Sequence, residues 1–194
     1  MFNKLAKDIT GSADVCKCIE PQQFGSEPVL SYLIPGEIPY ILLKSGKEEH
    51  IFTDQAYILS QGESSVSARR LVQRFHYSSN LITNVRFETA GMSMSDRDVE
   101  LKFEINGNGT SIDIWKNEIE KAKFYYKAIV GLSKAQAQNS RIMELARYTV
   151  GAYRVPQENQ NPLVAIEFAE ALYSRYNPSS YQSVFEKYLL NNPK

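Results

Sequence analysis

The chain has 194 residues, of which 43% are hydrophobic and 23% are charged, as in an ordinary folded protein. Its 22 basic and 22 acidic residues cancel, which argues against nucleic acid as a partner and disfavours membrane contact while leaving it open. We expect a cytoplasmic protein, because the sequence shows no signal-peptide core at its start and no apolar run near the ~18 residues that span a bilayer.

The N-terminal 35 residues predict short helices. Phe2, Leu5 and Ile9 have helical spacing, and Pro21 is typical of the start of a second short helix. Cys16 and Cys18, the only cysteines, are too close together for a mutual disulfide.

Residues 36–116 are rich in strands. Six short segments carry β-branched and aromatic residues, and turn formers separate them, so we expect roughly seven strands. The segments cover 37–43, 50–59, 67–78, 81–89, 98–105 and 110–115. Residues 44–49 predict a hairpin turn, and the Asn-Gly repeat at 106–109 predicts a second one. Apolar and charged residues alternate over 98–105, as in an antiparallel sheet with one buried face.

The period becomes helical from residue 117. We expect a closing helix over 117–131 that Gly131 ends or bends, a second helix over 142–153, and two more that begin at Asn161-Pro162 and Asn177-Pro178. Strands followed by helices indicate the α+β class with an antiparallel sheet. We place one domain over 1–131, with its strand-rich core at 36–116, and a helical extension over 132–194.

Three strings in the strand-rich region are distinctive: HIFTDQAYIL (50–59), RFHYSSNLITNVRFETAG (74–91) and DVELKFEINGNGTSIDI (98–114). In this order they resemble the conserved strands of the bacterial pleckstrin-homology-like (PH-like) family over about 37–130. The matching motif residues are Phe52, Thr53, Tyr77, Glu88, Thr89, Ala90, Gly91, Glu100, Leu101 and Lys102. The tail is similar to the oligomerisation extension of YvbH-like proteins.

This resemblance implies a PH-like antiparallel barrel or sandwich of about seven strands closed by one helix, with short N-terminal helices and a helical extension. It also implies homo-oligomers and no known catalysis. Gly91 stands where the chain turns between two strands, so we expect Gly91→Val to destabilise the fold. Thermal unfolding measures this, and an unchanged melting temperature would refute the turn.

Chemical sites are poorly supported. The two cysteines with His50 and His76 lack the paired spacing of zinc sites. Asp96, Asp98 and Glu100 alternate, which indicates the wet face of a strand more than a Ca²⁺ loop. The sequence contains no nucleophile elbow, P-loop or dinucleotide fingerprint. We therefore expect no enzyme, no metal and no cofactor.

Lys44 and Lys47 in the first hairpin are the candidate anion or lipid contacts, although Glu48 and Glu49 follow directly. Arg69, Arg70 and Arg74 form the densest basic cluster, which is more typical of an exposed sheet face or of ion pairs than of a nucleic-acid site.

The tail is rich in tyrosine, and the segment 162–176 is apolar over more than one face. The candidate oligomer interface is Tyr173, Tyr176, Tyr181, Phe185 and Tyr188. Packing of these helices on one another remains an equal alternative on the residues alone. With the resemblance, we predict a non-enzymatic, self-assembling PH-like interaction module whose partner is itself, with other proteins as an open addition. The alternative is a peripheral lipid- or small-ligand-binding domain.

Overall fold

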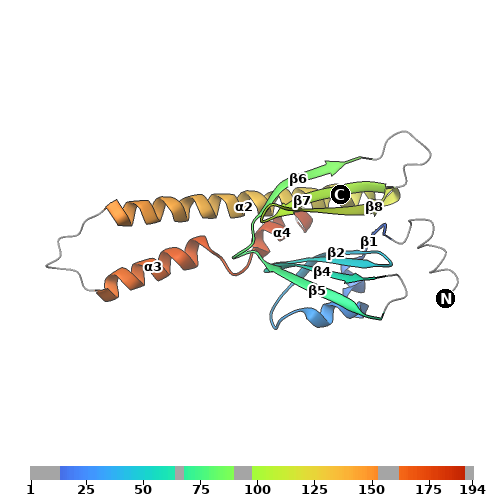
Figure 1. Cartoon of the computed structure of the whole chain (residues 1–194), viewed down its shortest axis with the longest axis horizontal. Coiled ribbons are helices and arrows are strands. Elements are labelled where there is room, and N and C mark those ends of the chain that lie inside the picture. Colours follow the sequence, from blue (N-terminus) through green and yellow to red (C-terminus); the bar gives the residue numbers. More distant parts are fainter. Residues whose placement is uncertain (1–13, 64–67, 90–97, 153–161, 191–194) are drawn as a thin grey trace.

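The computed structural model describes residues 14–63, 68–89, 98–152 and 162–190. Two antiparallel sheets face each other, and two long helices extend beyond them to one side (Figure 1). The elements are β1 (Lys17–Cys18), η1 (Pro21–Ser26), η2 (Pro28–Tyr32), β2 (Pro39–Lys44), β3 (Glu48–Thr53), β4 (Ala56–Gly62), β5 (Arg70–His76), β6 (Ile82–Glu88), β7 (Asp98–Ile105), β8 (Asn108–Trp115), η3 (Lys116–Glu118), α2 (Ile119–Ala152), α3 (Pro162–Tyr176) and α4 (Gln182–Leu189). The predicted α+β class is confirmed. The predicted first helix and the turn at Ala90 and Gly91 lie outside the described residues.

One sheet has the order β1-β2-β3-β4-β5 and the other β6-β7-β8, with every pairing antiparallel. The seven longer strands agree with the predicted number. The prediction of a single strand over 50–59 was wrong. The chain turns at Asp54 and Gln55, so this segment contributes to two strands, β3 and β4. The predicted turn at 106–109 is confirmed: Asn106 and Gly107 have φ of 51° and 83°, the left-handed values that a two-residue hairpin requires.

The main core lies between the sheets. Val99, Leu101, Phe103 and Ile105 point inward from β7, as their alternation predicted, and the first half of α2 covers the open side. Residues 16–18 join the two sheets on the other side. β1 pairs with β2, while the N–H of Cys16 donates to Asp113 O at 2.7 Å on β8.

A smaller cluster covers the outer face of the five-stranded sheet. Phe24 from η1 and Val29 from η2 pack on Leu42, Ile51 and Ile58. The helix predicted from Pro21 is therefore two consecutive 3-10 helices, and the central strands are buried on both faces.

The predicted helix end at Gly131 was wrong, because α2 is one helix of 34 residues that runs through this position. Gly131 instead makes room for α4. A Cβ built on Gly131 would lie 2.3 Å from a ring carbon of Tyr188. The domain boundary that we placed after residue 131 stays a prediction.

The start of the last helix also differs from the prediction. Pro162 opens α3 as expected, but α4 begins at Gln182 and not at Pro178. Tyr181 is the N-cap residue, and its N–H donates to Asp54 O at 2.6 Å. This bond holds the start of α4 against the turn between β3 and β4.

Candidate functional site

The part of α2 that extends beyond the sheets and the helix α3 form a projecting pair (Figure 1). We call residues 137–152 of α2 together with α3 the arm. Side chains of the arm are described for 137–148 and 167–176, and none of these is buried. The first half of α2 differs, since Ala122, Ala128, Ile129 and Leu132 are completely buried there. The long helix therefore has a core half and a surface half.

Large apolar side chains lie exposed on the arm. The exposed fraction is 59% for Leu145 and 81% for Tyr148 on α2, and 53% for Phe168 and 56% for Tyr173 on α3. The two helices contact each other, and Ile142 on α2 and Leu172 on α3 are half-buried. When two helices pack on each other, each buries only the stripe of side chains that faces the other helix. Large apolar residues on the rest of the helix surface are therefore typical of an interface with another protein or another copy.

The two helices of the arm carry opposite charge. The α2 part has Arg141, Glu144 and Arg147, a net charge of one positive unit, whereas α3 has Glu167, Glu170 and Arg175, a net charge of one negative unit. A second arm could therefore place its acidic helix against the basic helix of the first.

The predicted interface residues differ in how far they are exposed to solvent. Tyr173 is exposed and Tyr176 is half-buried on α3. Tyr181 and Phe185 are only 4% and 0% exposed, because they pack in the core of their own chain, and their part in an oligomer interface stays a prediction. Tyr188 is half-buried against Gly131. The apolar stripe of α4 is real, but it faces the core of its own chain.

Leu145, Tyr148 and Phe168 were not among the predicted interface residues. Leu145 and Phe168 occur in ordinary helical stripes, which show that a face is apolar without showing whether anything covers it. The broad apolar surface of 162–176 was the available signal for Phe168.

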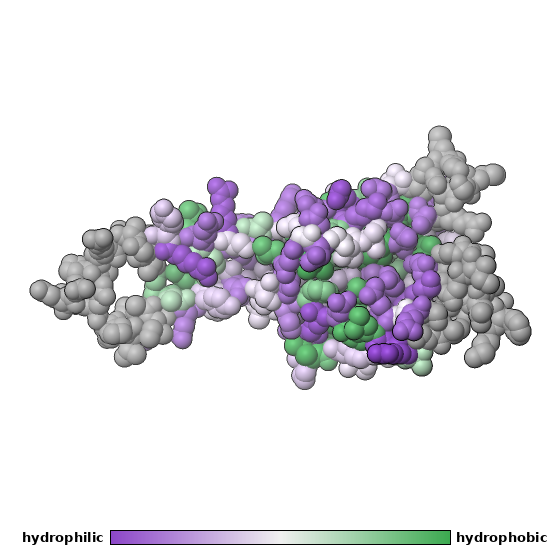
Figure 2. Space-filling view, viewed as in Figure 1, coloured by the Kyte–Doolittle hydropathy of each residue, from purple (hydrophilic) through white to green (hydrophobic). Residues whose placement is uncertain are grey.

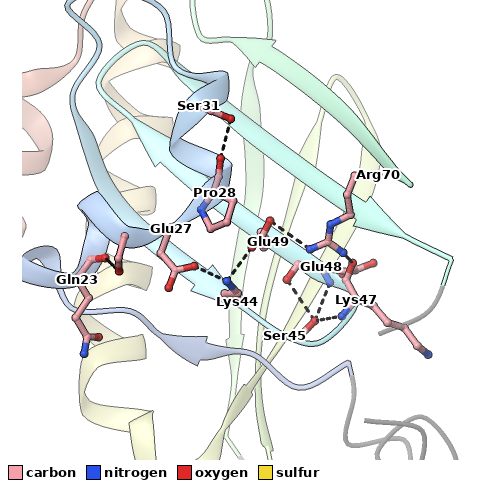
Figure 3. A network of polar contacts seen from close by, with 11 residues as sticks. Gln23, Glu27, Pro28, Ser31, Lys44, Ser45, Lys47, Glu48, Glu49 and Arg70 are labelled. Carbon is pink, nitrogen blue, oxygen red and sulfur yellow. Dashed lines mark hydrogen bonds and ion pairs between the residues drawn. The ribbon is translucent and has the colours of Figure 1, made fainter. Parts of the chain in front are cut away.

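Both candidate anion contacts in the first hairpin are paired with carboxylates. Figure 3 shows the pairing of Lys44 with Glu27 and Glu49. Lys44 bonds Glu27 and lies 3.2 Å from Glu49, and Lys47 lies 3.1 Å from Asp14. Desolvation disfavours the charge on Lys44, but its bonds to Glu27 and Glu49 outweigh this and raise its pKa. These ion pairs leave little attraction for an added anion.

Two arginines of β5, Arg70 and Arg74, also form ion pairs on the outer face of the five-stranded sheet. Arg70 lies 3.2 Å from Glu49 and donates to Lys47 O at 2.6 Å, while Arg74 lies 2.6 Å from the buried Glu37. Both arginines thus form the ion pairs that the sequence suggested, and they help to close the outer face of the sheet.

His50 and both cysteines are buried inside the protein. His50 is 1% exposed, with Nδ1 2.8 Å from Tyr57 Oη and Nε2 3.2 Å from a Glu48 oxygen. A carboxylate is within reach, but the buried ring cannot meet a substrate. Burial raises the pKa of Cys16 and Tyr57, and it raises the pKa of Cys18 to about 12. These thiols and this phenol stay protonated at neutral pH.

His76 lies exposed on β5, and its Nε2 accepts a hydrogen bond from Arg74 Nε at 3.1 Å. In the described part of the chain, no three His, Cys, Asp or Glu residues gather to hold a metal ion. Of the alternating carboxylates, Glu100 bonds Lys102 at 2.5 Å, and Asp96 lies outside the described residues.

Several of the family-motif residues lie in the core or form ion pairs across strands. Phe52 and Leu101 are completely buried in the core, and Tyr77 is 2% exposed beside Tyr181. Lys102 bridges Glu88 at 2.8 Å and Glu100 at 2.5 Å across β6 and β7. Thr89 is exposed at the end of β6.

Thr53 shapes the turn between β3 and β4. Its Oγ1 accepts from the N–H groups of Gln55 at 3.1 Å and Ala56 at 2.8 Å, and it lies 2.5 Å from Glu37 Oε1, to which it donates. A threonine at this position therefore satisfies two backbone donors and orients the glutamate that pairs with Arg74.

We expect Thr53→Val to lower the free energy of unfolding by about 1–2 kcal/mol, because the shape is kept but the N–H groups of Gln55 and Ala56 lose their acceptor. Urea denaturation measures the change. Thr83→Val, at an exposed position on β6, is the matched control and should change stability by less than about 0.5 kcal/mol. Equal effects of the two substitutions would contradict this role of Thr53.

Among the described residues, no helix is both long and apolar enough to cross a membrane.

Comparisons with known proteins agree with this fold. Residues 10–133 match the family model of the bacterial PH domain. The chain is 32% identical to the uncharacterised protein YvbH of Bacillus subtilis (strain 168) over 206 aligned positions, which cover 98% of this chain and all of YvbH. It also resembles the crystal structure of a PH-domain-containing bacterial protein from Exiguobacterium sibiricum 255-15. The TM-score is 0.79 at 29% identity, and the match covers 91% of this chain and all of the other. The chain belongs to the bacterial PH domain family.

Proposed function

We propose that the chain is a non-enzymatic interaction module that joins copies of itself through the arm. The family context supports an interaction role, because PH-like domains are generally non-catalytic modules that bind proteins or lipids. The observation that carries the proposal is the arm, which places four large apolar side chains on its surface while none of its described residues is buried. Free arms would leave this apolar surface in water.

A second copy is the partner that best fits the arm. Two arms related by a two-fold axis can pack α2 of one against α3 of the other, which gives a four-helix bundle with a shared apolar core. The opposite net charges of the two helices favour this pairing over α2 on α2.

Light scattering after size-exclusion chromatography tests the proposal. We expect a dimer or larger at micromolar concentration, and we expect Phe168→Glu with Tyr173→Glu to give the mass of one chain. Leu71→Glu is the matched control, since Leu71 is 60% exposed on β5, away from the arm. A wild-type chain that elutes as a clean monomer, or a Leu71 variant that dissociates like the arm variant, would refute the role of the arm.

The alternative function, a peripheral lipid- or small-ligand-binding domain, has less support, because Lys44 and Lys47 are both engaged by carboxylates. Co-sedimentation with anionic vesicles tests it. Binding that Lys44→Glu with Lys47→Glu abolishes would favour the alternative.

A further inference from the structure

The strand β5 forms one edge of the five-stranded sheet, where it is the outermost strand (Figure 1). The N–H of Tyr77 donates to Gln55 O at 3.0 Å, so these two opposite residues form a hydrogen-bonded pair in register with the ladder of β4 and β5. Opposite residues of an antiparallel pair alternate between bonded and non-bonded pairs. The main-chain N–H and C=O groups of Val72 and Arg74 therefore point away from β4, towards the open edge.

The open edge of β5 has no partner within the chain. In the ranges that the structure describes, no hydrogen bond uses the outward main-chain groups of Val72 or Arg74. The edge ends at His76, since the turn that follows occupies His76 O with the N–H groups of Ser79 and Asn80. A row of unpaired groups is thus available to a further strand.

The other edges of the described strands are protected. β1 is two residues long, and a bulge at Asn84, with φ of 49°, interrupts the pairing of β6. On β8, Cys16 donates to Asp113 O and accepts from the Trp115 N–H. By contrast, β5 pairs with β4 over seven residues without a register shift. A regular, uncovered edge is the kind to which proteins add an extended peptide.

The side chains beside this edge differ between its two faces. Leu71, Gln73 and Phe75 lie on the face towards the other sheet, where Leu71 is 60% exposed and Phe75 is half-buried against the main core. On the opposite face Arg74 pairs with Glu37, but Nη1 of Arg74 is shielded from water and has no hydrogen-bond partner among the described residues. Apolar residues opposite Leu71 and Phe75 and a carboxylate opposite Arg74 would complement these faces.

We infer that β5 binds an extended segment of another protein, which adds to the sheet as a further antiparallel strand and presents apolar residues on one face and acidic residues on the other. A second copy of β5 fits this edge poorly. Antiparallel pairing of two β5 strands would bring Arg70 and Arg74 of both copies onto one face, and like charges across a strand pair are unfavourable. The inference does not depend on self-association, which we assign to the arm.

Fluorescence anisotropy of the full-length chain with a labelled synthetic peptide, TIETVIE, tests the inference. In the antiparallel register its third residue, Glu, lies opposite Arg74, its fifth opposite Val72, and its two Ile opposite Phe75 and Leu71. Methyl groups on the backbone nitrogens of residues 3 and 5 remove the N–H groups that face β5, and we expect them to weaken binding by at least about tenfold. Methyl groups at residues 4 and 6 are the matched control, because these N–H groups point away from β5, and affinity should change by less than about threefold.

Two variants test the edge from the side of the protein. Val72→Pro removes only an outward N–H, which an edge strand tolerates, and Leu71→Glu removes the exposed apolar contact. We expect both variants to weaken peptide binding by about tenfold or more while light scattering gives the mass of the wild-type assembly. Loss of binding without a change of mass keeps this inference separate from self-association.

Three results would overturn the inference. The first is no saturable binding up to about 1 mM peptide, and the second is equal loss of affinity for the two methylated peptides. The third comes from hydrogen exchange of the free chain, in which the amides of Val72 and Arg74 should exchange faster than that of Gln73 and slow when peptide is added. Protection of both amides before peptide is added would show that a second copy already covers the edge.

Discussion

Phe185→Ala is expected to lower the free energy of unfolding by about 3–5 kcal/mol, as for other large side chains deleted from a core. Phe185 is completely buried, stacks on Tyr40 and lies near Tyr77, with ring centroids 6.4 Å apart. Its removal leaves a cavity between α4 and the sheet that these rigid aromatic neighbours cannot close. Urea denaturation followed by circular dichroism measures the loss.

The matched control is Phe124→Ala on α2. Phe124 is 37% exposed, and its ring lies under the Lys127 ammonium group, 5.4 Å from the ring centre. We expect this substitution to cost no more than about 1 kcal/mol, from lost partial burial and the lost contact with the cation. If both variants lose the same stability, α4 does not belong to the cooperative core.

Gly131→Val is expected to destabilise the chain by about 2–3 kcal/mol, although glycine is a poor residue in the middle of a helix. Helix propensity alone would favour the substitution by a few tenths of a kcal/mol. The contact at 2.3 Å reverses the sign, because the new side chain must displace the Tyr188 ring and with it α4. Thermal unfolding of the variant against wild type measures the net effect.

A double-mutant cycle isolates this clash. In a Tyr188→Ala background the space at residue 131 is free, and Gly131→Val should then be neutral or slightly stabilising. Destabilisation of the same size in both backgrounds would show that Gly131 matters to the helix itself and not to α4.

Local patterns predicted the parts of the fold whose cause is local. The alternation over 98–105 identified both faces of β7, because side chains of a strand alternate whatever the strand packs on. The turn at Asn106 and Gly107 was also predictable, since asparagine and glycine are among the few residue types that adopt positive φ at low cost.

The errors concern contacts between distant segments. Gly131 looked like a helix end because nothing nearby in sequence shows that Tyr188, 57 positions later, needs its space. Likewise, the spacing of Tyr181 and Phe185 shows that one face of α4 is covered, but not whether its own chain or a neighbour covers it. The pairing of Lys44 was half predictable, since Glu49 is close in sequence while Glu27 comes from η2's N-cap.

The N-terminal segment that joins the sheets and covers the outer face has a practical consequence for anyone who wishes to shorten the chain. Leu42, Ile51 and Ile58 are shielded by Phe24 and Val29, and Cys16 and Cys18 tie β8 to β2. A truncated chain that starts at β2 would expose an apolar sheet surface and a free strand edge, which together favour aggregation. The minimal folding unit should therefore start upstream of Cys16.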